Sequence, residues 1–110
     1  MNWYSLENES DLNRIQEKSF ETPQVIFKHS TRCSISAMAK GRLDAAVKAE
    51  GLEFHYLDLI RFRDLSNEIA ARFHVHHESP QTLLIKNGEC ILDQSHWEIR
   101  YEELAETAAS

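Results

Sequence analysis

Apolar and polar residues along this chain are spaced as in an alternation of helices and strands. Residues 1–6 suit either a short edge strand or an irregular arm. The remaining elements, in chain order, are predicted as a helix over 8–19, a strand over 24–30, a helix over 34–50, a strand over 52–59, a helix over 64–73, two strands within 81–93 and a helix over 95–108. This order predicts an α/β protein.

Particular residues mark the ends of these predicted helices. Ser10 or Asp11 is suited to cap the first helix, and Gly51 to end the second. Ser95 is the expected N-cap of the last helix, with Glu98 three positions on in the spacing of a capping box. These signals predict one continuous helix at the end of the chain.

The predicted connections favour a mixed sheet. The strands over 24–30 and 52–59 are joined by a long helix, so we expect them to be parallel, with a right-handed crossover. Asn87-Gly88 lies between two strand-like runs and predicts a β-hairpin, which adds two antiparallel strands. We therefore expect a four-stranded mixed sheet with helices on both faces.

Composition narrows the possible partners. The 110 residues suggest one domain over 1–110. The net charge of −6 argues against binding to nucleic acid or to an anionic membrane surface. No apolar run approaches the length of a membrane span, and the charged first residues do not resemble a signal peptide, so we expect a cytoplasmic protein. Two cysteines, Cys33 and Cys90, are too few for a disulfide scaffold.

Cys33 is the leading candidate for chemistry. It lies where a predicted strand of a parallel pair meets a helix, and open α/β sheets place their sites at such junctions. The unpaired N–H groups and the dipole of a helix start favour a thiolate, and Arg32 and Lys28 add positive charge. Ser36, one turn on, is placed to donate a hydrogen bond to the sulfur. The alternative is a small apolar residue that fills a gap in the core.

Several other groups carry weaker signals. The segment 74–78, HVHHE, is conceivable as a metal site. At this spacing, however, its histidine side chains do not converge on one point, and a solvated loop is favoured. His29 and His96 are both candidates to approach Cys33, as in a Cys–His pair. Cys90 lies on the second strand of the predicted hairpin and is expected to be buried or at the sheet edge, and inert, with a role as resolving cysteine as the less favoured alternative.

The Ser79-Pro80 bond precedes the predicted hairpin. X-Pro bonds are the only ones that are readily cis, and a cis bond here would leave the Ser79 backbone free to pair with an extended ligand. From the residues alone, a trans proline that begins the strand is favoured.

Taken together, the segments FKHSTRCSIS, HESPQTLLIKNG and SHWEI resemble those of the monothiol bacilliredoxins, a thioredoxin-like family first grouped as general stress proteins, over Trp3 to Leu104. The resemblance implies a thioredoxin-like fold with a cis bond before Pro80. It also implies a thiol–disulfide oxidoreductase that removes bacillithiol from S-thiolated client proteins through Cys33. The small thiol would be a co-substrate, and no other cofactor is expected. Members usually have proline after the cysteine, where this chain has Ser34.

In this scheme Cys33 takes up the small thiol from the client, and a second small-thiol molecule then regenerates Cys33. No cysteine one turn later is present to resolve the intermediate internally. Arg32 and the helix start near Ser95 are candidates to bind carboxylates of the small thiol. The residues expected to bind substrate around the catalytic Cys33 are Thr31, Arg32, Ser34, Ser36, Ser79 and Pro80.

Other functions remain open at this stage. One is a thioredoxin-like scaffold that binds clients. Another is an iron–sulfur cluster carrier of the monothiol glutaredoxin type, although its CGFS motif is CSIS here. A third is a peroxide-sensing thiol that forms a sulfenic acid.

Overall fold

A computed structural model describes residues 2–46 and 51–110. The described strands form a five-stranded sheet in the order β1-β3-β2-β4-β5. The strands are β1 (Trp3–Ser5), β2 (Gln24–His29), β3 (Glu53–Asp58), β4 (Gln81–Lys86) and β5 (Glu89–Ser95). The α-helices are α1 (Glu9–Lys18), α2 (Ser34–Ala45), α3 (Arg63–Phe73) and α4 (Tyr101–Ala109).

The sheet is mixed, as predicted, but the expected number of strands was wrong. Strands β2 and β3 are parallel, and β4 and β5 follow as an antiparallel hairpin. The additional strand is β1, which pairs in parallel with β3 at the edge of the sheet. Trp3 anchors it, because its indole Nε1–H donates to Asp44 Oδ1 of α2 at 2.8 Å.

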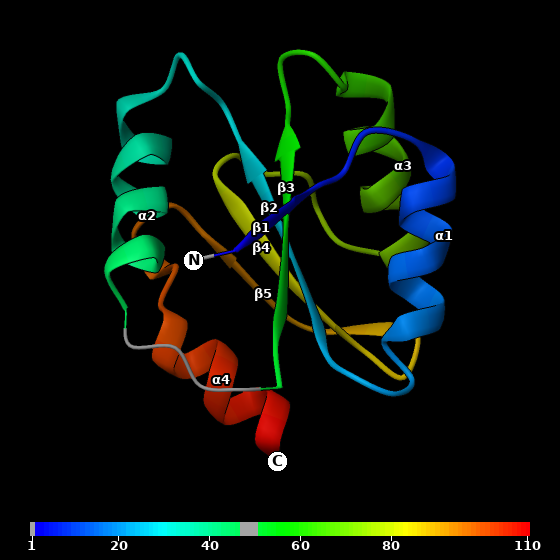
Figure 1. Cartoon of the computed structure of the whole chain (residues 1–110). Helices are drawn as coiled ribbons and strands as arrows, with labels where there is room; N and C mark the ends of the chain where they lie inside the picture. Colours follow the sequence, from blue (N-terminus) through cyan, green and yellow to red (C-terminus); the bar gives the residue numbers. More distant parts are fainter. Residues whose placement is uncertain (1, 47–50) are drawn as a thin grey trace.

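Helices cover both faces of this sheet (Figure 1). Helices α1 and α3 pack on one face, around a core that includes Ile26 and Ile69, and α2 and α4 pack on the other, around Phe27 and Leu43. Consecutive residues of β2 therefore contribute to opposite layers, as the alternation of side chains in a strand requires. The same alternation decides which side chains of β2 lie on the side of α2. Among the described residues, none of the helices has the length and apolar character needed to cross a bilayer.

Helix ends differ from their predicted positions. Asn8, rather than Ser10 or Asp11, caps α1, and its side-chain oxygen accepts from the Asp11 N–H at 2.8 Å. Helix α2 ends at Ala45, because Ala46 has extended backbone, so the predicted helix was too long; the predicted end at Glu50 falls outside the described residues.

The predicted final helix is divided in two. A 3₁₀ turn, His96–Glu98, is followed by extended backbone at Ile99 and Arg100, and only then does α4 begin. Ser95 precedes the turn without a side-chain capping bond, so the expected capping box does not form. Ile99 is fully buried in the core on the α2 side of the sheet, and the extended backbone of Ile99 and Arg100 interrupts the helix.

The predicted hairpin is confirmed. Asn87 and Gly88 form the turn between β4 and β5, and both have positive φ angles, 54° and 81°. These values match the turn type that an Asn-Gly pair favours.

Candidate functional site

Cys33 lies at the junction between β2 and α2. β2 ends at His29, and a tight turn follows in which the Cys33 N–H donates to the carbonyl of Ser30 at 3.1 Å. Cys33 is the N-cap residue of α2, and its carbonyl accepts from the Ala37 N–H at 3.1 Å. The side chain is partly exposed, and its sulfur makes no capping bond. This thiol is therefore accessible at the positive end of a helix.

The residues beside Cys33 in the chain are open to solvent. Thr31, Arg32 and Ser34 are all exposed. Among the described residues, the Arg32 guanidinium has neither a hydrogen bond nor an ion pair. It is therefore available to bind an anionic group near the sulfur.

Ser36 is fully buried beneath this turn. Its Oγ accepts from the Ser30 N–H at 3.1 Å and is hydrogen-bonded to His29 Nδ1 at 2.6 Å. In this arrangement the hydroxyl ties the first turn of α2 to the end of β2, and it makes no bond to the Cys33 sulfur. Burial, followed by the nearby Lys40 ammonium, lowers the pKa of His29, so this histidine is neutral at pH 7.

The Ser79-Pro80 turn lies at the same end of the sheet. In the β2–β4 register Lys28 is paired with Gln81, the residue directly after Pro80. The Ser79-Pro80 bond is cis, so the trans bond favoured from the residues alone was wrong, and the resemblance gave the correct isomer. Pro80 is buried and its carbonyl accepts from the His96 N–H at 3.0 Å. Ser79 Oγ is buried and has no partner among the described residues.

Lys28 was expected to add positive charge near Cys33, but it faces the other side of the sheet. It is fully buried, and its Nζ lies 3.2 Å from the carbonyl of Ser66 in α3 and 3.1 Å from His77 Nδ1. Sequence reasoning missed this contact and assigned His77 to a solvated loop. The alternation of β2 was the available signal, because it places Lys28 opposite its neighbour His29.

Two other histidines lie near the Glu78 carboxylate. Glu78 lies 3.8 Å from His76 Nε2 and 4.0 Å from His96 Nε2. Within the described part of the chain, His, Cys, Asp and Glu side chains form no group of three suited to a metal ion. The start of the segment after Ser95 is the short 3₁₀ turn, which does not offer the helix end expected to bind a carboxylate.

The second cysteine lies in a different environment. Cys90 packs against the core on the α1–α3 face, whereas Cys33 begins α2 on the opposite face. Its thiol contacts the carbonyl of Leu92 at 3.4 Å. Burial, and then Asp93, raises the pKa of the Cys90 thiol to about 11. Both cysteines are free, and they are not arranged as a pair.

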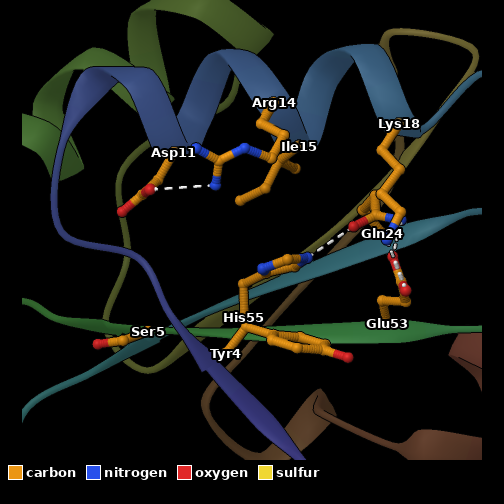
Figure 2. Close-up of a pocket in the computed structure, with 9 residues that line it drawn as sticks. All are labelled: Tyr4, Ser5, Asp11, Arg14, Ile15, Lys18, Gln24, Glu53 and His55. Atoms are coloured by element: carbon orange, nitrogen blue, oxygen red, sulfur yellow. Dashed lines mark hydrogen bonds and ion pairs between the residues drawn. The ribbon is translucent and has the colours of Figure 1, made fainter.

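A separate pocket opens between α1 and the β1–β3 edge (Figure 2). It has a volume of about 240 Å³, and His55 Nε2 lies 2.6 Å from Gln24 Oε1 within it. Burial lowers the pKa of His55 to about 4. Gln24 and Glu53 begin their strands, so the pocket extends toward the end of the sheet opposite Cys33. Its lining residues are Tyr4, Ser5, Asp11, Arg14, Ile15, Lys18, Gln24, Glu53 and His55. None of these lining residues is a cysteine, so this pocket offers no thiol.

Comparison with solved structures identifies the fold. A proposed oxidoreductase with a thioredoxin fold is 30% identical to this chain, with a TM-score of 0.84, and the match covers 98% of this chain and 94% of the other. Fasciola hepatica thioredoxin is 20% identical, with a TM-score of 0.72 and 96% of each chain covered. Malassezia sympodialis thioredoxin is 13% identical, with a TM-score of 0.72 and coverage of 98% and 89%. The thioredoxin-like fold is therefore confirmed.

The family comparison covers most of the chain. Residues 4–104 match the family model described as monothiol bacilliredoxin BrxC. This family and the thioredoxin fold support a thiol-based redox function. The chain belongs to the monothiol bacilliredoxin family.

Proposed function

We propose that this protein is a monothiol thiol–disulfide oxidoreductase that removes a low-molecular-weight thiol, such as bacillithiol, from mixed disulfides of client proteins. The observation that carries the proposal is the partly exposed thiol of Cys33 at the start of α2, while the Cys90 thiol packs against the core on the other face, where burial raises its pKa. Ser36 occupies the position one turn on and bonds to β2. An intermediate on Cys33 therefore has no neighbouring thiol in the described structure to resolve it.

The reaction takes place in two exchanges. The Cys33 thiolate attacks the small-thiol sulfur of the mixed disulfide, and a new S–S bond joins Cys33 to the small thiol. The S–S bond to the client breaks, and the client leaves as a thiolate that takes up a proton. A second small-thiol thiolate then attacks the bound small thiol. This step forms the symmetrical small disulfide and restores the Cys33 thiolate.

The surrounding residues have separate roles in this proposal. Arg32, exposed beside the thiol, binds a carboxylate of the small thiol. Thr31 and Ser34 line the same turn, and Ser36 supports it from below.

The cis Ser79-Pro80 turn presents the Ser79 backbone to the client segment. The Ser79 hydroxyl supports this role, because a buried hydroxyl without a partner in the described structure is suited to accept or donate a bond when a ligand arrives.

The test compares two matched variants on a protein carrying a bacillithiol mixed disulfide. Cys33→Ser is expected to abolish release of the small thiol, because it removes the nucleophile. Cys90→Ser is expected to retain most of the wild-type rate. Equal loss of activity in both variants would refute the monothiol scheme and indicate that the two cysteines act together.

A further inference from the structure

Lys28 is an unusual residue for the centre of a sheet. It is fully buried in β2, and no carboxylate among the described residues forms an ion pair with it. Its Nζ instead bonds to the carbonyl of Ser66 and to His77 Nδ1. A buried ammonium without an acidic partner is costly, so its presence in the sheet points to a role beyond packing.

These contacts hold the segment that leads into the Ser79-Pro80 turn. His77 is two residues before Ser79 and is bonded to Lys28 at 3.1 Å. Gln81 secures the same segment, because its Nε2 donates to the carbonyl of His76 at 2.9 Å and its Oε1 accepts from the Glu78 N–H at 3.4 Å. Lys28 and Gln81 are paired in the sheet register. Two neighbouring polar side chains, Lys28 on β2 and Gln81 on β4, therefore hold residues 76–78, which lead into the turn.

The contact between Lys28 and His77 requires particular protonation states. An ammonium group only donates hydrogen bonds, so His77 Nδ1 must accept and the proton of its neutral ring lies on Nε2. Ser66 Oγ also lies 3.4 Å from this nitrogen.

The charges around His77 favour its neutral form. Burial, then the charges of Lys28 and Arg63, lowers the pKa of His77, while Glu78 opposes this effect and His76 adds to it. Burial lowers the pKa of Lys28 to about 8. Below about pH 8 the charged ammonium donates to a neutral His77, and above it the neutral amine donates the same bonds more weakly, because charge-assisted hydrogen bonds are the stronger ones.

We propose that Lys28 is a positioning residue that, through His77, holds the Ser79-Pro80 turn in the geometry that receives the extended client segment of a protein mixed disulfide. This inference rests on the proposed function and defines its substrate class further. A protein substrate pairs with the Ser79 backbone and needs the turn to be fixed. A small reagent that reacts directly with Cys33 does not. Lys28 should therefore affect protein substrates selectively.

The test uses one lysine variant and a matched pair of histidine variants. Lys28→Met and His77→Leu remove the contact, whereas His77→Asn keeps an acceptor close to the position of Nδ1. For the protein mixed disulfide, Lys28→Met and His77→Leu are expected to raise KM about tenfold, and His77→Asn to stay within about threefold of wild type. Alkylation of Cys33 by iodoacetamide is expected to stay within about twofold in all three variants.

A pH profile separates positioning from general damage to the fold. Dividing the exchange rate by the alkylation rate at each pH cancels the ionisation of Cys33. The wild-type ratio is expected to fall above about pH 8, as Lys28 loses its proton, and the Lys28→Met ratio to lack this step. An unchanged KM in Lys28→Met and His77→Leu, or a parallel loss of alkylation, would overturn the inference.

Amide hydrogen exchange distinguishes this inference from the proposed function. If the Lys28 contact holds the turn, the Glu78 N–H exchanges faster in Lys28→Met than in wild type. Equal protection in the two proteins would overturn the positioning role. Wild-type protein that releases no small thiol from the mixed disulfide would instead refute the proposed function, whatever the hydrogen exchange shows.

Discussion

Replacement of Lys28 by methionine is expected to change how the stability of the protein depends on pH. Burial lowers the pKa of Lys28 from 10.5 to about 8 in the folded protein. Between about pH 8 and pH 10.5, Lys28 binds a proton in most unfolded chains but in few folded ones. The free energy of unfolding therefore rises with pH in this range. A difference of about 2.5 between the two pKa values corresponds to about 3 kcal/mol over the whole window. About 2 kcal/mol of this falls between about pH 7 and pH 9.5.

Urea unfolding of the wild type and of Lys28→Met at these two pH values measures the effect. The variant has no group that titrates at this position, so subtracting its unfolding free energy removes contributions common to both proteins. The difference, wild type minus variant, is expected to rise by about 2 kcal/mol from about pH 7 to 9.5. For a slope of about 1–2 kcal/mol per molar urea, this corresponds to a relative midpoint shift of about 1–2 M.

Lys40→Met provides the matched control. Lys40 is partly exposed and paired with Asp44, so this variant reports the effect of losing a lysine that is not enclosed. At pH 7, Lys28→Met is expected to be at least as stable as wild type, because an apolar side chain replaces an unpaired buried charge. Parallel pH curves for wild type and Lys28→Met would refute the reasoning, since they would mean that folding does not change the protonation of Lys28.

Two further predictions concern the site. Because burial raises the pKa of the Cys90 thiol to about 11, iodoacetamide at pH 8 is expected to modify Cys33 in the native protein and Cys90 only after unfolding. Peptide mapping measures this, and comparable native labelling of both cysteines would contradict it. Ser36→Ala leaves the buried His29 Nδ1 and the Ser30 N–H without their partner, and is expected to lower the free energy of unfolding by about 1–3 kcal/mol. Urea unfolding checks this, and a loss below about 0.5 kcal/mol would show that water or another group replaces the hydroxyl.

The sequence predicted those parts of the fold that local patterns determine. The Asn87-Gly88 turn was found because its backbone conformation depends on those two residues. The short strand β1 was left undecided, and the predicted sheet omitted it, because three residues carry too little alternation to identify a strand. What defines β1 is pairing with β3 and the bond from Trp3 to Asp44, which are contacts distant in the sequence.

The site was predictable to a similar extent. The place of Cys33 at a strand–helix junction followed from the order of apolar runs, and the resemblance supplied the cis bond before Pro80. The sequence did not predict where the side chains of Lys28 and Ser36 point. Their partners, His77 for the lysine and His29 for the serine, are chosen by packing on opposite faces of β2. Reading the alternation of the strand would have separated Lys28 from Cys33, but it could not have named His77.

The most direct test of the central claim is the intact mass of the protein after incubation with oxidised bacillithiol and, separately, with oxidised glutathione, followed by peptide mapping. One adduct is expected, on Cys33, because this thiol is partly exposed at the start of α2, whereas the Cys90 thiol packs against the core on the other face and burial raises its pKa to about 11. In line with the proposed function, the adduct is expected to form preferentially with bacillithiol. Absence of any adduct, or an internal Cys33–Cys90 disulfide, would contradict a monothiol mechanism.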